Sequence, residues 1–424
     1  MEPRKGIFQK SNFEKNDSFQ RAIYPALLCA EIFGLFPVVG VKHFRPEKLN
    51  FSWKNIRTSL TIIYIAIGTL MLIFNLRQII IIGMTAKNFV GLAFYSCCIA
   101  SYISFLCLSR KWAAIMHVWV EKENVFLNYP YQVNRIPVVI HVRLIAFIFL
   151  SMALLEHALA LGNSAYNIFA EASYCKYNIP DTSKYYFLQR FQFVFQVIPY
   201  NFPLGLLLTW MNFCLTLSWN LMDIFTIMIS LGLTKRFEQI NDRLNLIKGK
   251  AVPESYWQQI RLHYVQVCEI VEYVEGILSP MILISCTNDL YFICYQLLNI
   301  FDYLPHQINY VYFWYSLLYL ILRTICLFLY TAEINDQANK PIEVLKTIPT
   351  FAWCVELDRF IHQTARESIC LSGMRFFFFT RKLLLSMIGT VVTYELVLMQ
   401  FDYKSGIREY SNSTTPTYAC DFAY

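Results

Sequence analysis

The stretch 58–82, TSLTIIYIAIGTLMLIFNLRQIIII, decides the fold class of this chain. Arg77 is its one charged residue, and most of the others are apolar. An α-helix needs about 20 predominantly apolar residues to cross the hydrocarbon core of a bilayer, where a charged side chain is costly. We therefore predict that this stretch is a transmembrane helix.

The same pattern occurs six more times, and the composition of the whole chain agrees with it. Of the 424 residues, 56% are hydrophobic and 15% are charged, whereas a soluble globular protein carries about 25% charged residues. This composition excludes an ordinary cytosolic enzyme, a disordered chain and a disulfide-stapled secreted domain. The predicted fold class is an all-α membrane protein with seven transmembrane helices, the other six at 88–108, 138–164, 202–231, 270–301, 308–332 and 376–401.

An eighth apolar run, 22–41, is predicted not to cross the membrane. It contains Pro25 and Pro37, and proline inside a helix removes a backbone hydrogen bond. We interpret the run as a short re-entrant or interfacial helix. It belongs to a predicted cytoplasmic N-terminal segment, residues 1–57, whose polar start lacks the apolar region of a cleavable signal peptide.

The distribution of Lys and Arg predicts the orientation, because these residues collect on the cytoplasmic side of membrane proteins. Of the 36 Lys and Arg residues, 27 lie in the N-terminal segment and the second, fourth and sixth loops, against six in the other loops and the C-terminal tail. The N-terminus is therefore predicted to be cytoplasmic and the C-terminus extracellular. This is the reverse of a G-protein-coupled receptor, and it accounts for the net charge of +7 without nucleic-acid binding.

The cytoplasmic loops are predicted to be helical. Residues 234–275 form two amphipathic helices broken at Gly249 and Pro253, the second of which runs without interruption into the fifth span. Residues 341–372 are predicted to form another helix, with Gly373 as a hinge before the last span. These projecting helices are suited to contacts between subunits; packing within one subunit is the alternative.

The predicted external segments contain two candidate modification sites. Asn412 begins an Asn-Ser-Thr glycosylation signal. Cys175 and Cys420 lie where a disulfide persists, and both a disulfide between them and two free thiols remain open. We find no His and Cys cluster at zinc spacing and no catalytic motif, so neither a metal, a cofactor nor an enzyme activity is predicted.

The last predicted span contains Thr393-Tyr394-Glu395-Leu396-Val397-Leu398-Met399-Gln400-Phe401. This resembles the signature of insect gustatory receptors, in which Thr-Tyr is followed by five mainly apolar residues and Gln-Phe. The stretches FGLFPVVGV (33–41) and DLYFICYQLLN (289–299), and the pair Glu156-His157, resemble the sugar-responsive branch of that family. Glu395 departs from the general family pattern, which has an apolar residue there, and is similar to the form in sugar receptors.

The resemblance implies a multi-pass receptor in the plasma membrane of a chemosensory neuron, in which sugar opens a non-selective cation channel. Four subunits, identical or related, would surround a central pore in the lipid bilayer, and each would hold a pocket in the outer half of the membrane. The chain would then divide into five segments. Residues 1–57 would be the cytoplasmic N-terminal segment and 58–332 the ligand-binding bundle. Residues 333–375 would be a cytoplasmic segment for subunit contacts, 376–401 the pore helix and 402–424 the extracellular tail.

Polar side chains inside the spans are the candidates for ligand binding, because they usually face a pocket, a pore or a partner helix. The predicted orientation places those of the third, fifth and sixth spans together in the outer half of the membrane. Sugar hydroxyls need carboxylates and amides as hydrogen-bond partners, and sugar C–H groups pack on aromatic rings. The predicted ligand-binding residues are Glu156, His157, Asp289, Tyr295, Gln296, Trp314 and Tyr315.

Several of these residues have a structural alternative. Glu156 and His157 are adjacent in the sequence, so their side chains cannot both point to the same side of the helix. A buried pair that holds helices together is the alternative for them. Trp314 and Tyr315 also suit an aromatic belt at the membrane interface. Structural ion pairs are predicted for Asp223 with either Arg143 or Arg323.

The predicted pore and gate residues follow one face of the last span. A ring of Gln amides between apolar side chains would pass hydrated cations only when widened. Glu395 lies about 200° around the helix from Thr393 and is predicted to face a neighbouring helix. The pore and gate residues are Thr393, Leu396, Val397, Gln400 and Phe401, of which Thr393, Gln400 and Phe401 belong, with Tyr394, to the family motif.

Three competing functions remain at this point. A receptor for a different tastant, such as a bitter compound, would share the fold. A metabotropic receptor is disfavoured by the predicted topology. A sugar transporter is weakened by the lack of an inverted pair of half-chains.

Overall fold

The computed structural model describes residues 17–83, 86–132, 136–175, 181–300 and 304–409. These residues form α-helices, short 3-10 turns and irregular connections, and their only β-type pairings are two isolated bridges. The all-α fold class predicted from the sequence is therefore confirmed.

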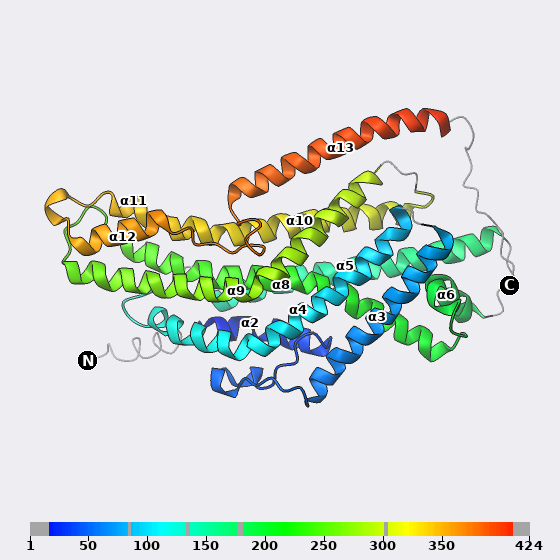
Figure 1. Ribbon diagram of the computed structural model, residues 1–424, viewed down its shortest axis with the longest axis horizontal. Helices are drawn as coiled ribbons and strands as arrows, with labels where there is room; N and C mark the ends of the chain where they lie inside the picture. Colours follow the sequence, from blue (N-terminus) through cyan, green and yellow to red (C-terminus); the bar gives the residue numbers. More distant parts are fainter. Residues whose placement is uncertain (1–16, 84–85, 133–135, 176–180, 301–303, 410–424) are drawn as a thin grey trace, which may run out of the picture.

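Each of the seven predicted spans falls on one long helix (Figure 1). By length and composition, α3, α4, α5, α8 and α10 are apolar enough to cross a membrane, while α9 and α13 cover the fifth and seventh predicted spans. The number of crossings and the side of each terminus stay predictions. The bounds are α3 (Ile56–Ile82), α4 (Ala86–Glu123), α5 (Val138–Tyr174), α8 (Phe202–Asn245), α9 (Glu254–Leu298), α10 (Gln307–Asn339) and α13 (Arg381–Glu409).

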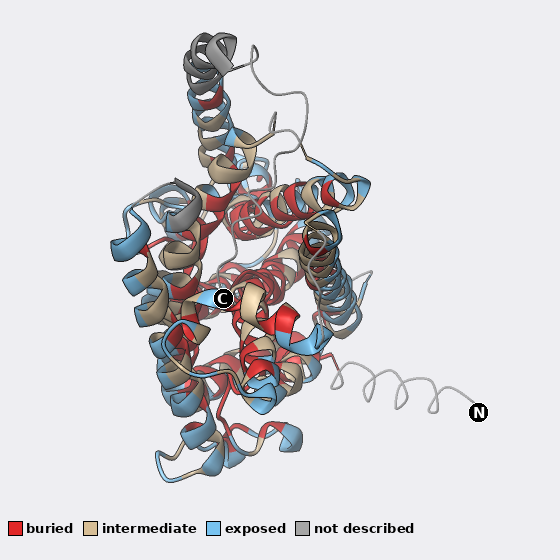
Figure 2. Ribbon diagram, turned by 90° about the vertical axis from the view of Figure 1, so that its right-hand side faces the viewer, coloured by how far each residue is buried: buried red, intermediate tan, exposed pale blue. Residues whose placement is uncertain are grey.

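Helix α8 is the centre of the bundle. It packs against α4, α5, α9 and α10, and 89% of its most apolar window is buried, against 17% for α3. Buried residues gather between the helices and exposed ones on the outside (Figure 2), while α13 stands away from the bundle along most of its length (Figure 1). The apolar exposed side of α3 therefore faces lipid, and α8 is sheltered from it.

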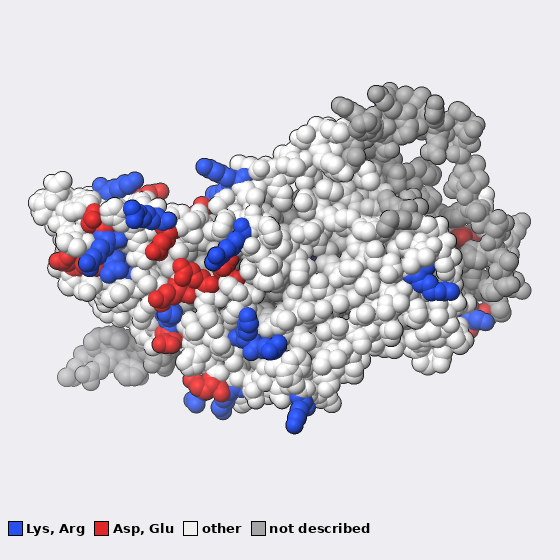
Figure 3. Space-filling model, in the orientation of Figure 1, with Lys and Arg blue, Asp and Glu red and all other residues white. Residues whose placement is uncertain are grey.

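Charged side chains lie mainly at one end of the molecule, where α8, α9 and α10 extend beyond the apolar belt (Figure 3). The visible face of the middle is almost free of Lys, Arg, Asp and Glu. A wide uncharged belt of this kind matches the hydrocarbon core of a bilayer, because charged groups inside that core are costly.

The run 22–41 contains one short helix, α2 (Phe19–Ile32), followed by irregular chain with two 3-10 turns, Val41–His43 and Pro46–Lys48. Helix α2 continues through Pro25. Proline leaves the carbonyl oxygen of Arg21 without its usual intrahelical donor. Arg143 Nη2 of α5 donates to that oxygen at 2.8 Å, so a neighbouring helix supplies the missing hydrogen bond.

The predicted break between the fourth and fifth spans is confirmed. Helix α8 ends at Asn245, Gly249 adopts a φ of +71°, and α9 starts directly after Pro253. Beyond the apolar belt, the ring of Tyr264 of α9 lies 5.3 Å from that of Phe360 in a tilted arrangement, and its hydroxyl donates to the carbonyl of Ala338 at 3.1 Å. The projecting helices thus pack on one another within a single subunit.

The prediction of a single helix over 341–372 is wrong. The chain instead forms α11 (Pro341–Leu345), a 3-10 turn (Thr350–Ala352) and α12 (Val355–Arg366). Pro349 interrupts it, because proline restricts the preceding residue to extended conformations.

The last helix also begins later than predicted, at Arg381 and not at 376. Ser372 and Phe378 form an antiparallel bridge, and Met374 and Arg375 between them have positive φ. Phe379 is then fully buried. The aromatic run before α13 is therefore a tight turn packed on the bundle, although its hydropathy resembles that of a span.

Gly232 of α8 has no room for a side chain between Phe19 of α2 and Trp119 of α4. A Cβ there would lie 2.4 Å from Phe19 Cδ2 and 3.0 Å from Trp119 Cζ2, and those two rings stack at 4.1 Å. We expect Gly232→Ala to lower the free energy of unfolding by about 1–3 kcal/mol through overpacking. Thermal unfolding of the purified receptor measures this. Gly276→Ala is the control, because a Cβ there meets open space; equal melting temperatures of the two variants would contradict the prediction.

Candidate functional site

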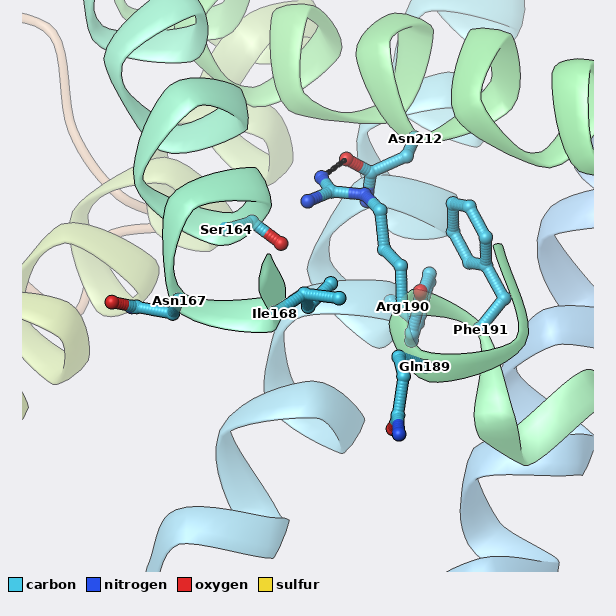
Figure 4. A pocket seen from close by; sticks show the side chains of 8 residues that line it. Ser164, Asn167, Ile168, Gln189, Arg190, Phe191 and Asn212 are labelled. Atoms are coloured by element: carbon cyan, nitrogen blue, oxygen red, sulfur yellow. Dashed lines mark hydrogen bonds between the residues drawn. The ribbon is translucent and has the colours of Figure 1, made fainter. Parts of the chain in front are cut away.

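A pocket of about 380 Å³ opens at the end of the bundle opposite α11 and α12. It lies between α4, α5, α8 and the short helix α6 (Thr182–Arg190) (Figure 4). Most of its wall is polar or aromatic, the composition that a hydroxylated ligand requires. The lining residues are Tyr95, Ser164, Asn167, Ile168, Gln189, Arg190, Phe191 and Asn212.

Of the described residues in this wall, Arg190 is the one with a charged side chain. Helix α6 positions it: Asp181 caps the start of that helix by accepting from the backbone N–H of Ser183 and Lys184, and Arg190 is its last residue. Arg190 Nη2 donates to Asn212 Oδ1 of α8 at 3.5 Å. Arg190 Nε and Asn167 Oδ1 have no hydrogen-bond partner within the described chain. One donor and one acceptor are therefore free for a ligand.

His157 lies below this pocket on the same face of α5. It precedes Ser164 by seven residues, which is two helical turns or about 10 Å along the axis. Its ring is 4.9 Å from that of Phe213, the neighbour of Asn212, and it interacts electrostatically with Arg190. His157 Nε2 is buried without a partner among the described residues. The predicted residue His157 thus adds another unpartnered polar atom, two helical turns deeper in the bundle than the pocket.

Glu156 and Gln296 are brought together by a residue that was not predicted from the sequence. Ser316 Oγ of α10 donates to Glu156 Oε1 of α5 at 3.0 Å and accepts from Gln296 Nε2 of α9 at 3.1 Å. Glu156 and Ser316 are both buried. This Glu156–Ser316–Gln296 chain joins the three helices on which the sequence placed the ligand site.

The aromatic residues of the predicted site do not all lie in one place. Tyr315 donates to the carbonyl of Met152 at 3.1 Å and so lies against α5 close to Glu156. Tyr295 is half-buried and stacks on Tyr291 of its own helix, with ring centroids 6.5 Å apart. Trp314 is 45% exposed on the outside of α10. The structure therefore places Trp314 away from the cluster, as expected of an interfacial aromatic.

Asp289 lies in a buried ion-pair cluster and not beside the pocket. Its Oδ1 accepts from Arg323 Nη2 at 2.9 Å and its Oδ2 from Thr324 Oγ1 at 3.0 Å. Asp223 Oδ2 lies 2.7 Å from Arg323 Nε, which decides between the two partners left open for Asp223. Arg143 bonds to a backbone carbonyl of α2 instead. Of the predicted ligand residues, Asp289 is thus the one held by an internal cation.

The free face of α13 carries the predicted pore residues that the structure describes. Thr393, Leu396 and Val397 are exposed in the single chain, whereas Glu395 is 6% exposed and faces α9 near Cys294. This agrees with the prediction that Glu395 turns towards a neighbouring helix. Gln400 and Phe401 lie within α13, but their side chains are outside the described part of the chain.

The predicted external modification sites are described only in part. Cys175, directly after α5, is disulfide-bonded. Its predicted partner Cys420 and the glycosylation candidate Asn412 lie outside the described residues, so that pairing and that modification stay predictions.

One feature could have revealed more of the site from sequence. Polar residues recur on α10 at alternating spacings of three and four, which defines one face of a helix; this pattern contains Ser316. Arg190 carries no such signal, since it reaches the pocket from a short helix outside the spans. The recurring α10 residues are Asn309, Tyr312, Ser316, Tyr319 and Arg323.

Comparison with known proteins supplies the family. The sequence model described as "Trehalose receptor" matches residues 1–410. The "Gustatory receptor for sugar taste 64a" of Drosophila melanogaster is 40% identical over 393 residues, covering 92% of this chain and 86% of the relative. The "Gustatory receptor 5a for trehalose" of the same species is 32% identical over 392 residues, covering 92% and 87%.

The fold has a counterpart among solved structures. The insect olfactory receptor OR5 from Machilis hrabei, solved in complex with eugenol, superposes with a TM-score of 0.63 and 15% sequence identity. The superposition covers 93% of this chain and 99% of that one. At this identity the likeness shows a shared fold alone.

Proposed function

Since the chain belongs to the trehalose receptor family of insect gustatory receptors, we propose that it is a sugar receptor that is itself a ligand-gated cation channel. It is a multi-pass protein of the plasma membrane in chemosensory neurons. Three parts of this proposal go beyond family membership: that the ligand is a sugar, that the chain forms a pore, and that the pore selects cations.

The Glu156–Ser316–Gln296 chain, with the polar pocket above it, is the observation that carries the assignment to sugar. A sugar offers many hydroxyls, each a donor and an acceptor, and needs a wall that supplies both. Arg190 Nε and His157 Nε2 are unpartnered within the described chain, while Glu156 is a buried carboxylate that accepts from Ser316. An apolar tastant would leave these buried groups unsatisfied, at a cost of about 1–3 kcal/mol each.

We place Glu156, His157, Gln296 and Tyr315 in contact with the sugar. Asp289 supports that wall through α9, which also carries Gln296. The affinity should be weak, because each hydrogen bond to the sugar replaces one with water and nets about 0.5–1.5 kcal/mol. A millimolar dissociation constant, about −4.1 kcal/mol, is expected, and suits a sensor of abundant sugars. Trp314 and Tyr295 are assigned to the outer surface.

We propose that α13 of four subunits lines the central pore, with Thr393, Leu396, Val397, Gln400 and Phe401 along it. Support comes from the exposed free face of α13 and from Glu395, which turns towards its own bundle. A homotetramer is the default because most oligomers consist of identical chains in closed point-group symmetry; related receptors are the alternative subunits. Large apolar side chains at the start of α12 and just before it, Phe351, Trp353 and Val355, are exposed and suit subunit contacts.

Opening is proposed to be a shift in population. Sugar binds the open state better than the closed one, and its differential affinity moves the equilibrium. Helices α9 and α10 are the coupling elements, because they supply Gln296 and Ser316 to the site and also pack against α13.

Expression of this chain alone in a cell without other taste receptors tests the proposal. We expect inward cation current in response to one or a few sugars, independent of G-protein signalling, together with surface expression. Current that requires G-protein signalling would identify a metabotropic receptor, and saturable sugar uptake without current would identify a transporter. Current to a non-sugar tastant alone would retain the channel and reject the ligand class.

A further inference from the structure

The ion-pair cluster between α8, α9 and α10 contains two carboxylates and one guanidinium. Asp223, Asp289 and Arg323 are each about 1% exposed. Arg323 contacts Asp223 through Nε at 2.7 Å and Asp289 through Nη2 at 2.9 Å. Both carboxyl groups therefore lie against the same guanidinium. With both carboxylates ionised, the cluster would carry a net charge of −1 in a site that water does not reach.

Among the residues that the structure describes, the side chains around the cluster add no second positive charge. Asn220 Oδ1 accepts from Arg323 Nη1 and from the hydroxyl of Tyr319. Ser285 donates to Asp223 and Thr324 donates to Asp289. The Trp219 ring lies 4.7 Å below the guanidinium. The titratable groups that interact with the cluster from α4, α5, α9 and α10 are Cys97, Glu156, Cys286 and Tyr319.

None of these groups is a cation, and Glu156 would add a further negative charge. Two carboxylates held on one guanidinium at a buried site do not both ionise, because repulsion and desolvation favour one neutral acid. A buried charge without a partner costs several kcal/mol. We therefore propose that Asp223 and Asp289 share one resident proton, so that this cluster is a proton-binding site and is neutral as a whole.

Infrared spectroscopy of the full-length receptor in lipid nanodiscs detects such a proton. A protonated carboxylic acid has an infrared C=O band separate from that of a carboxylate. We expect Asp223→Asn and Asp289→Asn each to remove the same acid band, because in either variant the remaining carboxylate pairs with Arg323 and ionises. Each single variant should keep a cooperative melting transition within a few degrees of the unmodified receptor, since asparagine resembles a protonated carboxyl.

Two further variants test whether the acid band belongs to this shared proton. Asp223→Asn with Asp289→Asn leaves Arg323 without a counter-charge and should abolish the cooperative transition. Glu31→Gln is the control, because Glu31 and Arg57 form a partly exposed one-to-one pair at 2.8 Å; it should leave both the melting transition and the acid band unchanged.

Three results would overturn the proposal. One is an acid band that survives either single substitution. Another is a single variant that loses its transition as the double variant does, since both carboxylates would then be required in charged form. The last is a melting temperature that rises when sodium replaces choline in the buffer, because a metal cation would then occupy the place assigned to the proton.

Discussion

Replacing Arg323 by methionine is expected to lower the free energy of unfolding by about 3–5 kcal/mol, the cost of removing one partner from a buried ion pair. The substitution leaves Asp223 and Asp289 without their shared cation at about 1% exposure. It also removes the donor to Asn220 and the cation above the Trp219 ring. Thermal or denaturant unfolding of the purified receptor measures the loss.

A matched arginine separates burial from ion pairing. Arg359 pairs with Glu356 at 2.6 Å but is 64% exposed, and exposed pairs contribute about 0–1 kcal/mol. Arg359→Met should therefore have little effect. Combining Arg323→Met with Asp223→Asn and Asp289→Asn should recover much of the loss, because neutral residues of similar volume often replace a buried ion cluster without cost. A loss below about 1 kcal/mol for Arg323→Met, the range of an exposed pair, would contradict this expectation.

Replacing Glu156 by alanine is expected to raise the half-maximal sugar concentration about ten- to hundredfold, with surface expression retained. A hydrogen bond to a charged group is worth about 1.5–3 kcal/mol, and each step of about 1.4 kcal/mol is a factor of ten in affinity. The substitution removes the acceptor for the sugar and releases Ser316, which Glu156 holds at 3.0 Å. Dose–response currents measure the shift.

Two controls at exposed positions make this result specific. Leu155 precedes Glu156 on the same turn of α5 and is 51% exposed on the lipid side, so Leu155→Ala should leave the response unchanged. Trp314→Ala tests the assignment of Trp314 to the outer surface, and we expect it to leave the half-maximal sugar concentration unchanged. An unchanged half-maximal concentration in Glu156→Ala would place the sugar elsewhere and would leave the channel assignment intact.

The sequence by itself determined the features that depend on composition along the chain. Hydropathy located seven long helices, because a span must be apolar over its whole length whatever packs against it. The break at Gly249 and Pro253 followed from local backbone preferences. Glu156, His157 and Gln296 were selected as candidates because a polar side chain is conspicuous within an apolar run, and the motif that begins at Thr393 indicated the family.

The tertiary structure alone decided which of these side chains meet. Asp289 and Gln296 lie seven residues apart on one helix face, yet Asp289 pairs with Arg323 while Gln296 reaches Ser316. Asp223 had two possible partners until the position of α10 selected Arg323. Arg190 enters the pocket from outside the spans. Contacts across helices depend on the rotation and depth of each helix in the bundle, and hydropathy along one chain contains no information about either.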